Sequence, residues 1–226
     1  MSDGHKDLHI NEFYKRLIFG TIYVIILWSA TIYSELSFSV LFAIIGFFCI
    51  YEMWQLRKGL SKLIAFSYVT IPFIIIQFFG FTDHNYPELK FDSSPILVLF
   101  ILTWIFDTFA YIVGSKIGKH KILPKISPKK SWEGFIGGFI FNLVSVYFIK
   151  QYFDCFSLFF LIILGIVIPF TASAGDFIAS YYKRIANVKD SGTIIPGHGG
   201  MLDRMDAFMI SIPVLYILIN LLNENS

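Results

Sequence analysis

The chain has 226 residues, of which 56% are hydrophobic and only 15% are charged, and its formal net charge is +2. A soluble domain of this length carries far more polar surface, so the composition excludes an ordinary water-soluble protein and predicts an integral membrane protein. The two cysteines show no CxxC or Cys/His spacing, so neither a disulfide framework nor a zinc site is expected.

Apolar stretches long enough to cross a bilayer recur along the chain. A spanning helix needs roughly 17 to 25 mostly apolar residues. We expect an all-α, polytopic membrane helix bundle of about seven spans, near residues 17–33, 36–51, 63–81, 95–114, 134–150, 157–182 and 205–222. The short second span is expected to tilt or to form a tight hairpin with the first. The long sixth span is expected to break near Pro169.

The basic residues predict the orientation of these spans. With seven spans and the N-terminus in the cytoplasm, 16 of the 18 lysines and arginines fall on the cytoplasmic side, and only Lys90 and Lys150 fall outside. This asymmetry is typical of membrane proteins, whose cytoplasmic loops are enriched in basic residues. The segments 52–62, 115–133 and 183–204 are therefore predicted to be cytoplasmic, as is the N-terminus.

The segment 127–134, Ser-Pro-Lys-Lys-Ser-Trp-Glu-Gly, places two lysines and two hydroxyl groups at the expected start of a helix. Helix N-termini with hydroxyl groups favour phosphate, and lysines add positive charge. Phosphate binding by Lys129, Lys130 and Ser131 is the preferred interpretation. The alternative is a basic loop that lies on an anionic membrane surface.

Two carboxylates fall inside predicted spans, where charge is costly. Asp107 and Asp176 would each cost about 2.5–3.5 kcal/mol at the centre of a spanning helix. Such residues usually face a polar cavity and pair with a cation, although a carboxylate near the interface can also reach water. Gly175 would let a backbone or a ligand come close to Asp176.

The polar stretch 180–206 lies between two apolar segments. Asp203 and Asp206 are three residues apart, so they share a face on a helix. Two carboxylates on one face suit Mg²⁺, although both acids would also be favourable at a helix N-terminus. Gly199 and Gly200 belong to a turn that can cradle phosphate, and His198 is interpreted as an anion contact. Carboxylates, cations and a glycine turn at the cytoplasmic face match phosphoryl or nucleotidyl transfer, and the membrane location predicts a lipid substrate.

The spacing of this stretch resembles a known signature. Its residues are Ser180-x₂-Lys183-Arg184-x₄-Lys189-Asp190-x-Gly192-x₃-Pro196-x-His198-Gly199-Gly200-x₂-Asp203-Arg204-x-Asp206. This pattern is similar to that of the phosphatidate cytidylyltransferase (CDP-diacylglycerol synthase) family. Three further segments are similar to the same family: Asp107-Thr108-x-Ala110-Tyr111-x₂-Gly114, 127–134 and Gly175-Asp176. The resemblance covers about residues 105–208.

The resemblance implies a nucleotidyltransferase that makes CDP-diacylglycerol and pyrophosphate from CTP and phosphatidate, in phospholipid biosynthesis, with Mg²⁺ and room for a second cation. Residues 1–226 would form one membrane-embedded catalytic domain, with N-terminal spans in 14–94 and a catalytic half in 95–222. The expected location is the bacterial inner membrane, with the N-terminus and the site cytoplasmic. A homodimer is expected, and a nucleic-acid partner is not.

The expected site residues fall into three groups. Metal binding is assigned to Asp176, Asp203 and Asp206. Catalysis is assigned to Asp176, Asp203, Lys189, Arg204 and His198. Substrate binding is assigned to Lys183, Arg184, Ser180, Lys129, Lys130, Ser131, Gly199, Gly200 and Asp107.

Three other functions compete with this interpretation. A CTP-dependent lipid kinase would release CDP in place of pyrophosphate. A CDP-alcohol phosphatidyltransferase would carry a longer aspartate-rich helix motif, which the sequence lacks. An ion-coupled transporter would use Asp107 and Asp176 as cation sites, but it would be expected to have two related halves, and no such repeat is visible.

Overall fold

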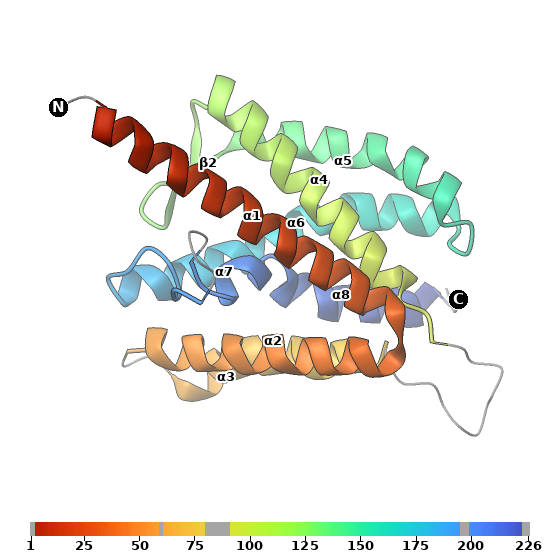
Figure 1. Ribbon diagram of the computed structural model, residues 1–226. Helices are drawn as coiled ribbons and strands as arrows, with labels where there is room; N and C mark the ends of the chain where they lie inside the picture. Colours follow the sequence, from red (N-terminus) through yellow and green to blue (C-terminus); the bar gives the residue numbers. More distant parts are fainter. Residues whose placement is uncertain (1–2, 59–60, 80–90, 195–198, 223–226) are drawn as a thin grey trace.

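The computed structural model describes residues 3–58, 61–79, 91–194 and 199–222 (Figure 1). Within these residues the chain forms eight helices and one two-stranded sheet. The helices are α1 Asp3–Tyr33, α2 Glu35–Leu56, α3 Lys62–Gln77, α4 Ser94–Ile117, α5 Trp132–Tyr152, α6 Leu158–Ile185, α7 Leu202–Met205 and α8 Phe208–Leu222. The strands are β1 Lys121–Leu123 and β2 Ser127–Ser131.

The helices have the length and composition of a membrane bundle. Four of them, α2, α4, α5 and α6, are long and apolar enough to cross a bilayer. Three shorter apolar helical stretches, Leu17–Tyr33, Lys62–Gln77 and Phe208–Leu222, complete the set. The all-α membrane class is thus confirmed. The seven apolar segments of the sequence all appear as helices, and the number that cross the bilayer stays a prediction.

The first two helices are joined by a tight turn, which matches the second of the two arrangements expected for the second span. Only Ser34 separates α1 from α2, and its side chain accepts a hydrogen bond from the backbone of Ser37 while the Ser37 hydroxyl bonds back to the Ser34 backbone. This capping box starts a new helix at once. The second span is longer than predicted, because α2 continues to Leu56.

The expected break near Pro169 is wrong, because α6 is continuous from Leu158 to Ile185. A proline lacks the N–H group that would bond to the carbonyl four residues earlier, which here belongs to Gly165. The side chain of Asn142 on α5, which is fully buried, donates to that carbonyl at 3.0 Å. A neighbouring helix therefore supplies the missing donor, which is how spanning helices tolerate proline.

Replacing Asn142 with leucine should lower the free energy of unfolding by about 1–3 kcal/mol, because the Gly165 carbonyl would be buried without a donor. Catalytic turnover should not change, because Asn142 lies on the α5–α6 contact and outside the site described below. Thermal unfolding in detergent measures the first effect and steady-state kinetics the second. An unchanged melting temperature would contradict the role given to Asn142.

Two local features differ from the predicted elements. The basic segment 115–133 is not a simple loop, because β1 and β2 pair in an antiparallel hairpin with Lys121 opposite Ser131. The predicted last span, 205–222, is divided into the short helix α7, a turn at 206–207 and α8. As predicted, a helix begins after the segment 127–131: Ser131 is the N-cap of α5, and its hydroxyl accepts a hydrogen bond from the Gly134 N–H at 3.2 Å.

A buried aromatic cluster joins the two halves of the chain. Phe42 of α2 lies 6.3 Å from Phe100 of α4, between ring centroids, and Phe100 lies 5.1 Å from Phe208 of α8. All three side chains are buried. The N-terminal helices therefore pack on the same core as the later ones.

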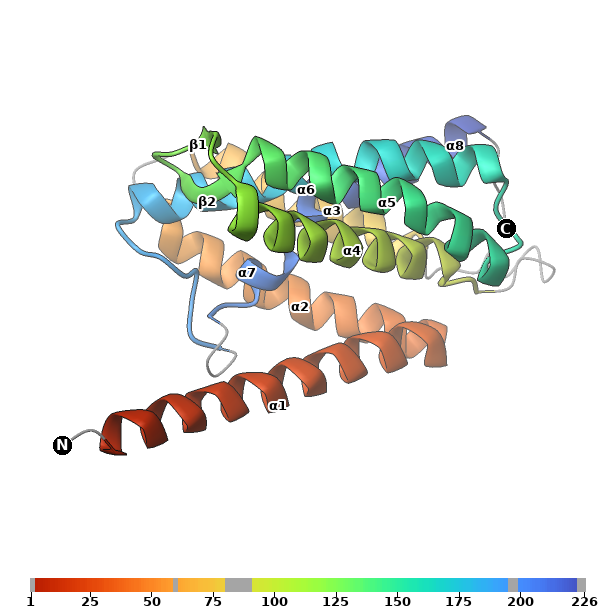
Figure 2. The same ribbon diagram turned by 90° about the horizontal axis from the view of Figure 1, so that it is seen from above.

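The segments predicted to be cytoplasmic meet at one end of the bundle. In Figures 1 and 2 the start of α1, the end of α2, the β-hairpin and the end of α6 all lie toward the same end, and the α5–α6 connection lies at the opposite end. This arrangement agrees with the predicted grouping of basic segments. The side of the membrane that this end faces stays a prediction.

Candidate active site

The C-terminal half of α6 presents one polar face. Asp176, Ser180 and Lys183 follow at spacings of four and three, so they lie along the same side of the helix. The Lys183 side chain is only 9% exposed, whereas that of Asp176 is 22% exposed. A lysine buried this deeply needs anionic partners.

Lys183 has two such partners, which come from α7 and the turn after it. Its Nζ donates to Oδ1 of Asp203 at 2.6 Å, and it lies 3.7 Å from Oδ2 of Asp206. The prediction that the two aspartates share a face is confirmed, since one amine reaches both. Lys183, expected to bind substrate, is engaged inside the protein in this structure.

Gly175 brings α6 against the turn that carries Asp206. A Cβ atom at this position would overlap the carbonyl oxygen of Asp206, so only glycine allows this approach. Tyr68 of α3 donates to the Gly175 carbonyl at 2.8 Å and holds the same point from the other side. Because Asp176 follows Gly175, this contact brings the backbone at Asp176 close to the backbone at Asp206.

Asp203 is the centre of a hydrogen-bond network. Its Oδ2 accepts from the backbone N–H of Ser191 at 2.7 Å and of Gly200 at 3.0 Å, and the Ser191 hydroxyl lies at 3.0 Å. Gly199 has a φ of 88°, a left-handed conformation that favours glycine. Gly199 and Gly200, expected to cradle phosphate, thus fold around this carboxylate.

Burial alone would raise the pKa of the Asp203 carboxyl. The ion pair with Lys183 and the N–H groups of Gly200 and Ser191 outweigh burial and hold this pKa below its ordinary value. Asp203 is therefore an anion at neutral pH, with both oxygens occupied by protein donors.

The β-hairpin supplies the cation for Asp176. The Nζ of Lys130 on β2 forms an ion pair with Oδ2 of Asp176 and lies 5.1 Å from the ring centre of Phe177. The structure therefore brings together the 127–134 segment and the intramembrane carboxylate, which are 46 residues apart.

Arg184 fastens the hairpin to the end of α6. Its Nε donates to the carbonyl of Ile126 at 3.1 Å, and its Nη1 donates to that of Val188 at 3.0 Å. The expected substrate-binding role of Arg184 stays a prediction, and the structure gives it a second role in holding the backbone.

Replacing Arg184 with alanine should loosen the turn at 124–126 between the two strands. Because Arg184 is exposed, its lost hydrogen bond to the Ile126 carbonyl is worth about 1 kcal/mol, which corresponds to roughly fivefold faster trypsin cleavage after Lys125. Mass spectrometry of timed digests measures this rate. The variant Lys62→Ala, which removes an exposed cation elsewhere, should leave the rate unchanged; an equal effect in both variants would contradict the contact.

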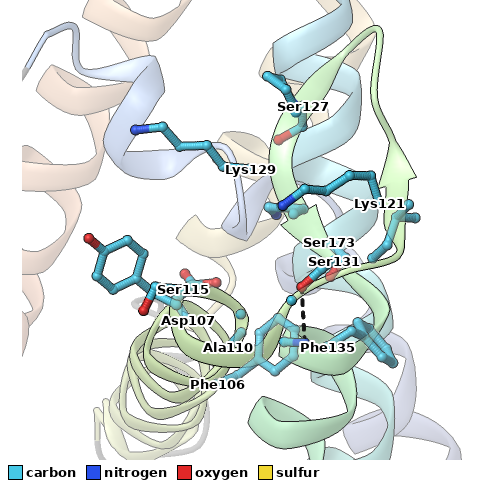
Figure 3. A pocket seen from close by; sticks show the side chains of 17 residues that line it. Phe106, Asp107, Ala110, Ser115, Lys121, Ser127, Lys129, Ser131, Phe135 and Ser173 are labelled. Carbon is cyan, nitrogen blue, oxygen red and sulfur yellow. Dashed lines mark hydrogen bonds between the residues drawn. The ribbon is translucent and has the colours of Figure 1, made fainter.

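A cavity of about 570 Å³ opens between α4 and the hairpin. We call it the hairpin cavity. In Figure 3, Asp107 and Ser115 of α4 lie on one side of it, and Lys129 and Ser131 lie on the other. Its floor is apolar, with Phe106 and Phe135, Ala110 and Gly134. Cations at the rim and an apolar floor suit an amphiphilic anion.

A second cavity, of about 350 Å³, lies beside the first, and we call it the acidic cavity. Asp107 lines both, so this carboxylate stands at their boundary. The acidic cavity also contains Asp203, Asp206 and Arg204, together with Tyr23 of α1. Two adjacent cavities that share a carboxylate can hold two substrates next to each other.

The remaining predicted residues are less central. Lys189 is exposed and lines a third cavity, of about 630 Å³, between the end of α2 and the 186–194 segment. Ser180 is half-buried on the polar face of α6. His198 lies outside the described residues.

Glu52 is a site residue that the sequence analysis missed. It lies on α2, is 1% exposed, and accepts hydrogen bonds from Ser191 and from the start of α7. The predicted span ended at residue 51, which placed this acid in a solvated loop. A carboxylate that directly follows an apolar run was the available signal.

The structure combines apolar helices of membrane-crossing length with one buried and one partly exposed lysine–aspartate pair near one end. These features define a helical membrane protein with a charged site. Comparison with known families gives the more specific assignment. A family model described as the cytidylyltransferase family matches residues 57–222, and the chain belongs to that family.

Curated relatives agree with this assignment. A phosphatidate cytidylyltransferase of Staphylococcus haemolyticus is 41% identical over 186 residues, covering 74% of this chain and 71% of the relative. Proteins of the same name from Staphylococcus epidermidis and Staphylococcus aureus are 38% and 41% identical over 156 and 157 residues. The match covers 69% of this chain and 58% of each of these two relatives, so the chain spans little more than half of their length.

Proposed function

We propose that this protein is a nucleotidyltransferase that makes CDP-diacylglycerol and pyrophosphate from CTP and phosphatidate. The observation that carries the proposal is a pair of adjacent cavities that share Asp107 in a membrane bundle. One is lined by Lys130, which pairs with Asp176, and the other by Asp203 and Asp206, which share Lys183. The names of the staphylococcal relatives support the same activity.

The reaction needs positioning and charge neutralisation more than covalent help. A phosphate oxygen of phosphatidate attacks the α-phosphorus of CTP, and the bond from that phosphorus to the β-phosphate bridging oxygen breaks as pyrophosphate leaves. The attacking group is already anionic near pH 7, so no strong general base is required. The main obstacle is repulsion between two polyanions.

The hairpin cavity is suited to one of these anions. Lys121, Lys129 and Lys130 line it, and Ser127 and Ser131 add hydroxyl groups. Its apolar floor would accommodate the glycerol and acyl ends of a lipid. The second anion would be bound by Arg204 in the acidic cavity and by Lys189 and His198 in the 186–201 segment.

The carboxylates differ in how well they fit Mg²⁺. Among the described residues no three His, Cys, Asp or Glu side chains are grouped closely enough to hold a metal ion. Asp203 already accepts from Lys183 at Oδ1 and from the N–H groups of Ser191 and Gly200 at Oδ2, so most of its lone pairs are in use. Asp176 and Asp206 have fewer partners, and Mg²⁺ commonly takes one or two carboxylates together with substrate phosphates.

We therefore assign Mg²⁺ to Asp176 and Asp206 in preference to Asp203. Held by Asp176 and Asp206, the ion would supply positive charge that offsets the charge of the phosphate groups. Asp203 and Lys183 then keep Asp206 and the 186–201 segment in place. A second cation would need a site beyond these residues.

The proposed location is the bacterial inner membrane, with the site on the cytoplasmic side, where CTP is available; a homodimer is proposed as well. A Thr193→Cys variant tests the orientation, because Thr193 is exposed on the segment beside the site. In a Cys155→Ser background, an impermeant maleimide should label it only from the cytoplasmic side of membrane vesicles. Labelling from the other side would overturn the topology.

The activity test uses the purified full chain with phosphatidate in mixed micelles, Mg²⁺ and CTP labelled in the cytidine. We expect equal amounts of labelled CDP-diacylglycerol and pyrophosphate, and no lipid product when diacylglycerol replaces phosphatidate. CTP labelled at the γ-phosphate distinguishes a lipid kinase, which would place this label in the lipid. A folded preparation that forms no CDP-diacylglycerol would overturn the proposal.

A further inference from the structure

Glu52 is a buried carboxylate that comes from outside the region matched by the family model. It lies near the end of α2, whereas the match begins at residue 57. Its side chain is 1% exposed. A carboxylate in such a place is stable only when hydrogen bonds satisfy its oxygens.

The protein satisfies both oxygens of Glu52 with groups of one segment. Oε1 accepts from the N–H of Met201 at 2.9 Å. Oε2 accepts from the N–H of Leu202 at 2.9 Å and from the hydroxyl of Ser191 at 2.6 Å. Glu52 therefore ties the beginning and the end of the 191–202 segment to α2.

The same segment is held by Asp203 from its other side. Ser191 and Gly200 donate their N–H groups to Oδ2 of Asp203, while Met201 and Leu202 donate theirs to Glu52. The Ser191 hydroxyl lies within hydrogen-bond distance of both carboxylates. The two carboxylates are thus linked through one short stretch of chain.

Glycines let the segment come this close to Glu52. A Cβ atom at Gly192 would lie 2.6 Å from Oε1 of Glu52, and one at Gly200 would overlap its carboxylate. A second contact from the same part of the chain supports the anchor, since Lys58 donates to the Ala186 carbonyl at 3.2 Å. Glu52 near the end of α2 and Lys58 just after it therefore contact both ends of the 186–201 segment.

We infer that Glu52 is a positioning residue for the nucleotidyl transfer reaction. It fixes Ser191 and residues 200–202 so that Asp203 holds Lys183 and, through it, the carboxylate of Asp206 in the acidic cavity. The N-terminal helices are then part of the active site and do more than anchor the protein in the membrane. This inference rests on the proposed function for its kinetic consequence, but its structural consequence can be measured independently.

The test uses Glu52→Gln in the full-length protein. Glutamine keeps the size of the side chain but replaces one acceptor oxygen with an NH₂ group, so one of the donors from Ser191, Met201 or Leu202 loses its acceptor. We expect kcat to fall at least tenfold, with the KM values for CTP and phosphatidate within twofold of wild type, because alignment is lost while binding remains. Ser191→Ala, which removes only the bridging hydroxyl, should lower kcat less, and Ser191→Thr should restore most of it.

Hydrogen–deuterium exchange of the peptide that covers 189–203 provides the independent readout. In Glu52→Gln the amides of Ser191 and Gly200, which bond to Asp203 and not to Glu52, should exchange at least tenfold faster. The control Asn142→Leu also removes a buried hydrogen bond, but its exchange in this peptide and its kcat should match wild type.

The inference is overturned if exchange in this peptide is unchanged in Glu52→Gln. It is also overturned if the kcat of Glu52→Gln stays within twofold of wild type. The same holds if kcat falls only as far as it does in Asn142→Leu when both variants show the same loss of melting temperature. If the wild-type protein forms no CDP-diacylglycerol, the proposed function fails, and the exchange measurement still decides whether Glu52 anchors the segment.

Discussion

Replacing Lys183 with methionine should reduce CDP-diacylglycerol formation by about a hundredfold or more and lower the free energy of unfolding by about 3–5 kcal/mol. Methionine has a similar length, so the cavity left behind is small. The loss of stability comes from the missing positive charge, because Asp203 and Asp206 would remain buried without their shared cation. Steady-state kinetics and thermal unfolding in detergent measure the two effects.

The double variant Lys183→Met/Asp203→Asn separates these effects. Removing the negative charge together with its partner should recover a substantial part of the lost stability, because breaking one half of a buried pair costs more than removing both. Activity should stay low, because Asp206 still lacks the amine. Additive stability losses would show that Lys183 and Asp203 do not act as a pair.

Asp176→Asn should lower kcat by about a hundredfold or more while the protein remains folded. The side chain is partly exposed, and its ion-pair partner Lys130 can turn toward solvent, so the cost in stability should be small. An amide is a poorer partner for a cation than a carboxylate, and its NH₂ group would face Lys130. Single-turnover measurements with CTP and phosphatidate separate this loss of chemistry from a loss of binding.

Asp154→Asn is the matched control for this substitution. Asp154 has a side chain that is 89% exposed and pairs with Lys150. It belongs to the α5–α6 connection, which lies at the opposite end of the bundle (Figure 1). The same chemical change there should leave kcat unchanged. A kcat for Asp176→Asn within threefold of this control would remove Asp176 from the reaction.

The class of fold and several site contacts could be predicted from the sequence. Long apolar runs are read directly as membrane helices, since each must satisfy its own backbone. The three-residue spacing of Asp203 and Asp206 predicted that the two side chains lie on the same face. This is confirmed, because the amine of Lys183 reaches both. The costly charge of Asp176 inside a span also predicted a cation nearby, which Lys130 provides.

Other contacts depend on tertiary packing that no local pattern encodes. The continuity of α6 through Pro169 depends on Asn142, a residue of another helix. Gly199 and Gly200 fit a phosphate cradle by composition, but in the fold they surround Asp203. Glu52 is about 140 residues away from the segment it holds, and only the folded chain brings them together.

The unbroken course of α6 has a consequence for the depth of the chemistry. A helix rises about 1.5 Å per residue, so Asp176 lies about 13 Å along the axis from the end of α6 at Ile185. In the proposed reaction, a lipid headgroup would have to descend from the surface of its leaflet to meet this carboxylate, and the lysines that line the hairpin cavity would lie along its route. The thickness of the surrounding bilayer should therefore influence the rate, because it sets how far the headgroup has to travel.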